Sequence, residues 1–294
     1  MPVFNGERYI HETLDSILGQ TFTDFDFVIS DNASTDSTEE ICRDYARRDE
    51  RISFTRHEEN RGASWNYGWV LANSSGPYYK WAAHDDLIAT TWLERCVQAL
   101  DDHPDAVLAF TGVAAIDADG VVTRLKHRQV TAESDVLHHR FREVISVRNN
   151  DPEAGFGLIR RDALRLTRGL GAYGGADRVL LTELALIGRF VEVPEVLFFN
   201  RDHPARSVRA EGDFRRRRAW WDPNARQQLL PSWRIGMEDA RAVARADLPW
   251  SARLKCWATL PYWAAGDLPG LARDFVFAAE VVGARRGNGG TKEP

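Results

Sequence analysis

The first half of the chain alternates short apolar runs with stretches of helical periodicity, and this alternation limits the fold more than any other feature of the sequence. Ile10, Leu14, Ile17 and Leu18 have the spacing of the buried face of a helix, and the run 25–30 that follows is typical of a strand. Further helices and strands are expected, in alternation, at 37–45, 52–56, 64–73, 78–82, 91–100 and 106–116. This order predicts an α/β domain with a mainly parallel central sheet flanked by helices.

The second half is less regular. A polar stretch at 125–150 is expected to mix loop and helix, and further elements are expected as a strand at 156–159, a helix at 177–188 and one or two strands at 191–200, around Pro194. Beyond about residue 212, Arg-rich and Trp-rich segments punctuated by prolines predict helices. We therefore expect a domain at 1–210, a helical C-terminal extension at 211–286 and a flexible tail at 287–294.

Bulk properties exclude several classes of function. The 294 residues suffice for a large core, and the net charge of −5 offers no electrostatic footprint for nucleic acid. The three cysteines, Cys42, Cys96 and Cys256, fit no metal or redox spacing and are typical of reduced thiols. No run approaches the roughly 18 apolar residues of a membrane span, and the first residues do not resemble a signal peptide. A cytoplasmic protein is expected.

Acidic residues follow two of the predicted strands. Asp31 follows the second strand, and Asp85 and Asp86 follow the fourth. Because ligands of open α/β sheets bind at the carboxyl ends of the strands, these carboxylates are the first candidates for a functional site.

Four short motifs now occur in order: 2–6 (PVFNG), 30–36 (SDNASTD), 60–62 (NRG) and 85–86 (DD). Together they resemble family 2 glycosyltransferases, and the resemblance covers roughly residues 1–207. It implies the GT-A (nucleotide-diphospho-sugar transferase) fold and an inverting, hexosyltransferase-type glycosyltransferase. The donor would be a nucleoside-diphosphate sugar, with a UDP or dTDP sugar favoured, and the acceptor a glycan, a lipid-linked molecule or a small molecule.

A nucleotide-sugar pocket is expected around the first three motifs. Asp31 can accept a hydrogen bond from the edge of a nucleobase, and Pro2, Phe4 and Asn5 would form the neighbouring turn that cradles the base. The alternative for the Asp31 region is a helix N-cap cluster, to which Ser34 and Asp36 are mostly assigned, and Ser37 with Glu40 fits a capping box.

The third motif offers a phosphate contact. Gly62 permits close backbone approach, and Arg61 can pair with phosphate oxygens, although an ordinary strand-to-helix loop would look the same. Asn66, one turn further on, could face the same pocket.

Asp85 and Asp86 are predicted to bind Mn²⁺ or Mg²⁺, because a diphosphate leaving group needs its charge offset and hard cations prefer oxygen ligands. By resemblance, one of the pair meets the metal and the other the ribose or sugar. His84 either assists them or, as is more usual for a histidine beside acids, is a bystander. Ala83 stands where the family's longer motif has its first aspartate, which leaves the number of carboxylate ligands open.

The segment 174–178 (GGADR) resembles the family's loop that carries a Glu-Asp pair. Asp177 would be the general base that takes the acceptor's proton, while Ala176 replaces the glutamate. The alternative for Asp177 is an N-cap role.

The segment 200–207 (NRDHPARS) resembles the family's closing element, in which His203 would bind the metal and Arg206 and Ser207 the diphosphate. Four arginines at 215–218 form either a solvated helix face or a contact with anionic lipid at the inner face of the membrane. The tryptophans of the extension have two interpretations. They either pack between helices or in a homodimer contact, or they form a belt at a membrane interface; they are Trp220, Trp221, Trp250, Trp257 and Trp263.

Two alternatives to a transferase stay open. Almost nothing precedes Pro2, where the family has a buried strand, so this strand is either upstream, absent or minimal. With Ala83 and Ala176, this motivates a non-catalytic sugar-nucleotide-binding protein of the same fold. A nucleotidyltransferase is the other, but it would be expected to carry a Gly-rich basic loop, which 2–8 does not supply.

Overall fold

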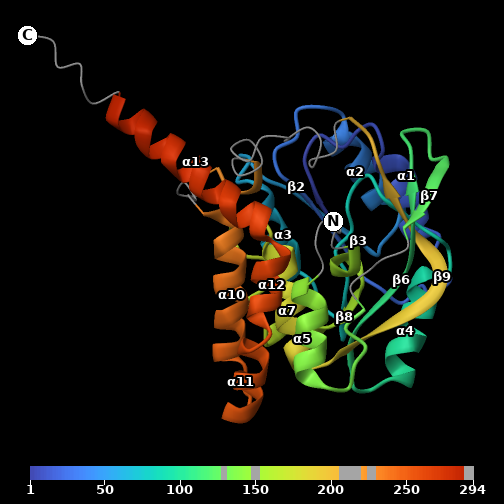
Figure 1. Cartoon of the computed structure of the whole chain (residues 1–294). Coiled ribbons are helices and arrows are strands. Elements are labelled where there is room, and N and C mark those ends of the chain that lie inside the picture. The colour runs from blue at the N-terminus through green and yellow to red at the C-terminus, as the bar shows by residue number, and fades with distance from the viewer. Residues whose placement is uncertain (127–130, 147–152, 205–219, 224–229, 288–294) are drawn as a thin grey trace, which may run out of the picture.

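The computed structural model describes residues 1–126, 131–146, 153–204, 220–223 and 230–287. An α/β body built on two sheets occupies one side, and the C-terminal helices pack along the other (Figure 1). The predicted calls on 127–130, 147–152, 205–219, 224–229 and 288–294, which include Arg206, Ser207 and the arginines at 215–218, lie outside the described residues.

The N-terminal third forms a three-stranded parallel sheet with helices between the strands. Its order is β1–β2–β3, in register so that Val3 pairs with Asp31 and Asp31 with Arg56. The elements are β1 (Pro2–Val3), α1 (Ile10–Leu18), β2 (Phe27–Asp31), α2 (Thr38–Arg48), β3 (Ile52–Arg56) and α3 (Ala63–Ala72). The predicted βαβα order is confirmed here, and β1 is a strand of two residues.

The second sheet has six strands in the order β4–β8–β6–β9–β5, with β7 paired to β6. Only β6 and β9 are parallel, and the other pairs are antiparallel. Its strands are β4 (Tyr78–Tyr79), β5 (Leu87–Ile88), β6 (Ala106–Ile116), β7 (Val122–Lys126), β8 (Leu158–Arg160) and β9 (Arg189–Arg201). Pro194 does not divide β9, because the register with β6 skips the residues around it: Thr111 pairs with Val193 and Gly112 with Val196.

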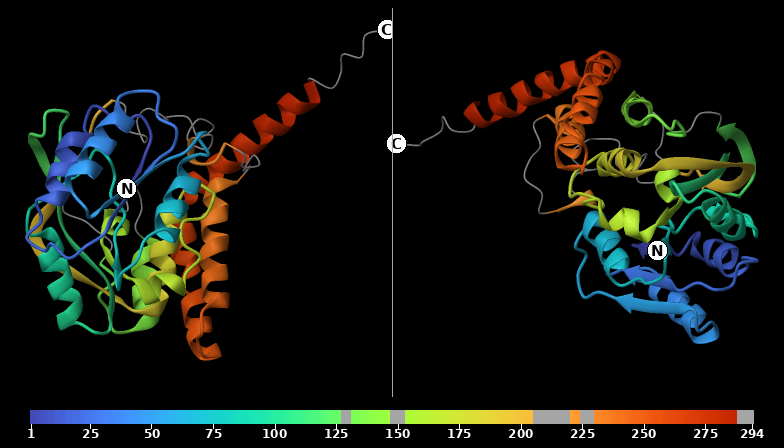
Figure 2. Two further views of the ribbon diagram at one scale, coloured as in Figure 1. Left: turned by 180° about the vertical axis from the view of Figure 1, so that it is seen from behind. Right: turned by 90° about the horizontal axis from the view of Figure 1, so that it is seen from below.

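The helices of the body cover these sheets, and Figure 2 shows them from two further sides. They include α4 (Trp92–Asp102), α5 (Leu137–Ser146), the 3₁₀ turn η1 (Glu153–Phe156), α6 (Arg161–Arg165) and α7 (Ala176–Ile187). Ile10 and Leu14 are fully buried, which confirms the predicted core face of α1. The predicted capping box at Ser37 is wrong: its side chain makes no capping bond, and the Asp36 carboxylate accepts from the Thr38 N–H instead, at 3.0 Å.

The C-terminal extension is helical, as predicted. It contains α10 (Pro231–Arg245), α11 (Trp250–Trp257), α12 (Leu260–Gly266) and α13 (Leu268–Gly287). Helix α10 packs on α7, α11 and α12 pack on α5, and α13 extends away from the body (Figures 1 and 2). Trp257 donates to the Ala240 carbonyl at 3.0 Å, so this tryptophan packs between helices.

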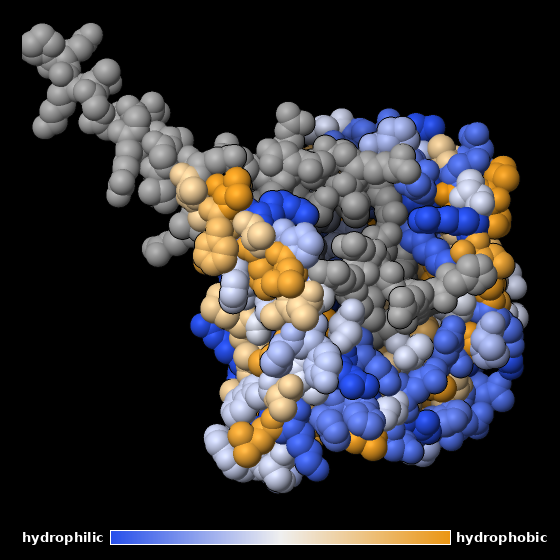
Figure 3. All heavy atoms as spheres, viewed as in Figure 1, coloured by the Kyte–Doolittle hydropathy of each residue, from blue (hydrophilic) through white to orange (hydrophobic). Residues whose placement is uncertain are grey.

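Exposed apolar side chains gather on the extension. Figure 3 shows apolar residues along α13, where Leu268, Phe275 and Val276 are exposed. Trp250 on α11 is also exposed. None of the helices in the described ranges is long and apolar enough to span a membrane.

Candidate functional site

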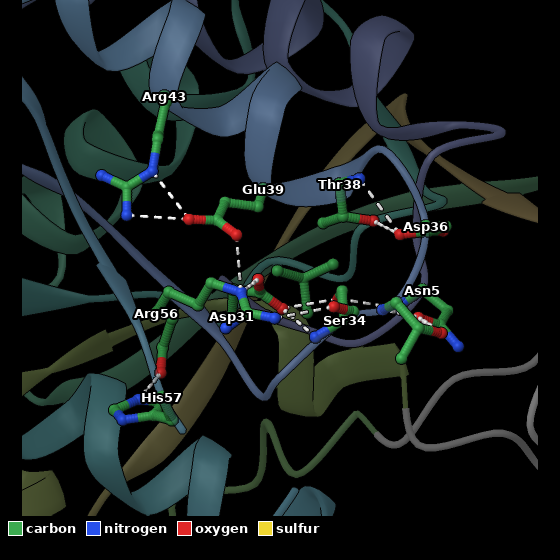
Figure 4. A network of polar contacts seen from close by, with 12 residues as sticks. Asn5, Asp31, Ser34, Asp36, Thr38, Glu39, Arg43, Arg56 and His57 are labelled. Carbon is green, nitrogen blue, oxygen red and sulfur yellow. Dashed lines mark hydrogen bonds and ion pairs between the residues drawn. The ribbon is translucent and has the colours of Figure 1, made fainter. Parts of the chain in front are cut away.

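Two loops at the carboxyl ends of β1 and β2 are joined by side-chain hydrogen bonds (Figure 4). The Asn5 N–H donates to the Ser34 hydroxyl, and the Asn5 side-chain oxygen accepts from the Thr35 N–H, both at 2.9 Å. Asn5 has a φ of 52°, a left-handed conformation that asparagine tolerates better than most residues. Asn5 therefore fixes the turn that contains Phe4, a partly exposed side chain.

Asp31 is fully buried at the end of β2. Its Oδ1 accepts from the Ser34 N–H at 2.9 Å and from the Ser34 hydroxyl at 2.5 Å. Its Oδ2 lies 3.4 Å from Nε of Arg56 but receives no hydrogen bond from any residue that the structure describes. A buried carboxylate oxygen without a donor is costly, and it is the acceptor that an N–H of a ligand would satisfy.

Arg61 of the NRG motif and the nearby Asn66 have different surroundings. Arg61 is half exposed, pairs with Glu59 at 3.0 Å and stacks on the Trp65 ring. The side chain of Asn66, by contrast, donates to the Ser30 carbonyl at 2.9 Å and accepts from the Ser30 hydroxyl, so it holds β2 on α3.

Gly62 lies beneath the segment 220–223. Its φ is +87°, and a Cβ atom there would lie 2.5 Å from Cδ of Pro223 and 2.9 Å from the Trp221 carbonyl oxygen. Trp221 continues across the site: its indole N–H donates to the Gly171 carbonyl at 2.9 Å, and its ring lies 5.8 Å from that of Tyr67. The predicted close approach at Gly62 is thus made by the chain itself.

Asp85 and Asp86 point to different partners. Oδ2 of Asp85 lies 3.0 Å from Nε2 of His203, which is buried against Tyr9. Oδ1 of Asp86 accepts from the Arg201 N–H at 2.9 Å and from the Asn200 amide at 3.1 Å. Asp86 is therefore bound to the end of β9, whereas Asp85 faces the histidine.

Arg201 keeps these carboxylates in place. Its side chain is fully buried, donates from Nε to the Asp85 carbonyl at 2.9 Å and pairs with Glu12 at 2.6 Å. The Thr13 hydroxyl donates to the Asp86 carbonyl at 3.0 Å, which ties the same loop to α1.

The acidic loop can supply part of a metal site. Among the described residues no group of three His, Cys, Asp or Glu side chains is arranged around one ion. Asp85 and His203, however, lie at 3.0 Å, about the separation of adjacent ligands on an octahedral ion with bonds of roughly 2.1 Å. A cation that takes its remaining ligands from substrate phosphate and water fits such a pair.

The charges of three carboxylates act on the phenol of Tyr67. Gly175, with a φ of +83°, begins α7 and places Asp177 in its first turn. Burial raises the pKa of Tyr67, and the charges of Asp85, Asp86 and Asp177 raise it further. The phenol thus lies within the electrostatic field of all three carboxylates, the metal candidates and the predicted base.

Sequence reasoning missed three residues of this site. Arg56, Tyr67 and Trp221 reach it from a strand end, a helix and the extension. Only Tyr67 had a local signal, since it follows Asn66 in the helix after the NRG motif.

Comparisons with known proteins identify the family of this chain. The model of the family described as Glycosyl transferase family 2 matches residues 1–167. An uncharacterised glycosyltransferase of Rickettsia typhi is 33% identical over 119 residues, which cover 40% of this chain and 36% of that protein. Glycosyltransferase GlyA of Streptococcus pneumoniae is 36% identical over 103 residues, 35% of this chain and 15% of that protein. The alignments thus span well under half of these relatives.

Solved structures agree with the fold. Residues 1–349 of S. aureus TarS, in complex with UDP, match with a TM-score of 0.63 and 17% identity, covering 90% of this chain and 70% of that one. The mannosyltransferase PcManGT of Pyrobaculum calidifontis, in complex with GDP-Man and Mn²⁺, matches with a TM-score of 0.52 and 19% identity, covering 95% and 85%. At these identities the likeness shows the fold alone, and it confirms the predicted GT-A architecture.

Proposed function

The chain belongs to glycosyl transferase family 2, and we propose that it transfers a sugar from a nucleoside-diphosphate sugar to an acceptor hydroxyl, with inversion at the anomeric carbon. The observation that carries this proposal is the pairing of Asp85 with His203 at 3.0 Å, at the end of the strands that carry the family's motifs.

The donor's base would bind at the carboxyl ends of β1 and β2. The unsatisfied Oδ2 of Asp31 supports this placement, with Pro2, Phe4 and Asn5 forming the adjacent turn. TarS was solved with UDP and with UDP-GlcNAc, and PcManGT with GDP-Man, so a nucleotide sugar is the donor class that the fold accommodates in those proteins. A UDP or dTDP sugar is favoured for this chain.

Asp85 and His203 would hold Mn²⁺ or Mg²⁺ together with the donor's diphosphate. The ion, when bound, supplies Lewis-acid charge that offsets the negative charge of the departing diphosphate. Asp86 would position the loop through Arg201 and Asn200 rather than by ligating the metal. Arg206 and Ser207 stay predicted diphosphate contacts.

Asp177 would be the general base. As the acceptor oxygen bonds to the anomeric carbon, the bond from that carbon to the diphosphate oxygen breaks on the opposite face. The hydroxyl proton passes to the Asp177 carboxylate, and the configuration inverts.

The acceptor would be a glycan, a lipid-linked molecule or a small molecule. The exposed apolar residues of α13 support contact with a second subunit or a membrane surface.

Calorimetric titration of UDP, dTDP and GDP, with and without Mn²⁺, tests the donor site. Metal-dependent binding of one of them is expected, and Asp85→Ala should abolish it. Asp177→Asn should keep that binding but lower the release of nucleoside diphosphate from the sugar donor about 10²- to 10⁴-fold. Asp162→Asn, an exposed aspartate on α6, is the matched control.

Two results would contradict the transferase. Full turnover in Asp177→Asn would remove the base assignment. Tight nucleotide binding without turnover of any sugar donor by the unaltered protein would favour the non-catalytic binding protein.

A further inference from the structure

An acceptor and a set of donors lie side by side at the ends of β2 and β3, and the proposed reaction uses only the acceptor. Asp31 and Arg56 are register partners in the parallel sheet, and Nε of Arg56 lies 3.4 Å from Oδ2 of Asp31 (Figure 4). Asp31 is fully buried, whereas about a third of the Arg56 side chain is exposed. The guanidinium thus lies between the buried carboxylate and solvent.

Glu39 holds the guanidinium away from the aspartate. Nε of Arg56 lies 2.8 Å from Oε2 of Glu39 as an ion pair, closer than its 3.4 Å to Oδ2 of Asp31. The other oxygen of Glu39 is bound by Arg43, at 2.9 Å from Nε and 2.8 Å from Nη2. The guanidinium is therefore ion-paired more closely with Glu39 than with Asp31, and Oδ2 of Asp31 has no hydrogen bond from any described residue.

Arg56 keeps unused donors beside that oxygen. A guanidinium has five N–H groups, of which one, on Nη2, donates to the Ser34 carbonyl at 3.0 Å, while the group as a whole is ion-paired with Glu39. The remaining N–H groups bond to none of the residues in the described ranges. The pair therefore presents a hydrogen-bond acceptor next to hydrogen-bond donors.

We propose that Arg56 is a specificity-determining residue which, with Asp31, reads a base edge that carries an N–H next to a carbonyl. Uracil, thymine and guanine have this edge. Cytosine and adenine have a ring nitrogen acceptor next to an amino group, which would face acceptor with acceptor and donor with donor. The inference rests on the proposed nucleotide site and assigns its substrate class as diphosphate sugars of uracil, thymine or guanine.

UDP and CDP are the matched probes, because they share ribose, diphosphate and one carbonyl and differ only at this edge. Calorimetry with Mn²⁺ on the full chain is expected to show that UDP binds at least about tenfold more tightly than CDP. If the protein uses a guanine nucleotide instead, GDP should bind more tightly than ADP by a similar factor. Arg56→Met should lower the affinity for the preferred nucleotide, UDP or GDP, about tenfold and leave the affinity for CDP or ADP nearly unchanged. Arg47→Met, an exposed arginine on α2, is the control.

Glu39→Gln gives an independent readout. Without the Glu39 charge, Arg56 is expected to move onto Oδ2 of Asp31 and lower UDP affinity severalfold. Adding Arg56→Met to Glu39→Gln should then cost little more, because the two changes act on one interaction. If Arg56→Met does not fold, Arg56→Lys keeps the charge but lacks the planar guanidinium. It should still reduce the ratio of UDP affinity to CDP affinity.

The outcomes separate this inference from the proposed function. Equal binding of UDP and CDP, and of GDP and ADP, would overturn the inference while leaving the transferase in place. An equal loss of UDP and CDP in Arg56→Met would reduce Arg56 to a general contact and also overturn it. Failure of every nucleoside diphosphate to bind the unaltered protein would instead remove the proposed function itself.

Discussion

Replacing Asp239 by asparagine is expected to stabilise the protein, increasingly so as pH rises. Asp239 lies on α10 against α7, the helix that begins with the proposed base, and its side chain is buried. Burial raises the pKa of Asp239 from 3.8 to about 7, against the opposing effects of a hydrogen bond with Thr182 and the charge of Arg178. The folded protein therefore holds a proton there that the unfolded chain has lost.

The sign follows from proton linkage. Below about pH 4 both states are protonated and the group has little effect; between pH 4 and 7 the folded state binds more protons, so stability falls as pH rises. Above pH 7 both states are ionised, and the loss of stability caused by burying the Asp239 charge no longer changes with pH. The difference between a pKa of 3.8 in the unfolded chain and about 7 in the folded protein corresponds to about 4 kcal/mol of stability.

Urea unfolding of Asp239→Asn and of the unaltered protein at pH 5.5, 6.5, 7.5 and 8.5 measures this difference. The variant's advantage should grow across the series by roughly 2 kcal/mol and level off above pH 7.5. Asp162→Asn, fully solvated on α6, should show no such trend. A constant difference across pH, or a variant less stable at pH 8.5, would refute the reasoning.

Two backbone predictions concern the loops of the site. Gly62→Ala should lower the free energy of unfolding by about 1–3 kcal/mol, because of its left-handed φ and the contact with Pro223. Gly68→Ala, where a Cβ meets open space within α3, should instead raise it by up to about 1 kcal/mol, and equal thermal shifts would contradict the argument. Asn5→Ala should cost about 1–2 kcal/mol, because it combines left-handed strain with loss of the bond to the Thr35 N–H. Asn5→Gly should recover part of this in chemical denaturation, and a larger loss in the glycine variant would show that strain plays no part.

Features of the fold with a local cause could be predicted from the sequence. The buried face of α1 follows from the spacing of Ile10 and Leu14, and the position of Asp31 follows from the end of an apolar run. The hairpin after β6 also has a local cause, because the Asp117 side chain accepts from the Asp119 and Val121 N–H groups and closes the turn.

The rest depended on competition or on distant segments. Ser37 lost the capping role to Asp36, which lies one residue away, because the better-placed carboxylate forms the bond. The difference between Asp85 and Asp86 was hidden, since adjacent residues point to different partners on β9 and beyond it. Trp221 contacts Tyr67 across more than 150 residues of sequence, so no local pattern could reveal it.

The close packing of Trp221 and Pro223 on Gly62 limits which hybrids can be made from this chain and its relatives. A C-terminal extension borrowed from a relative would have to bring a segment that fits this glycine, and a borrowed N-terminal domain would have to offer one. Hybrids joined between residues 204 and 220 should therefore succeed or fail as matched pairs, with the glycine loop and its covering segment inherited together.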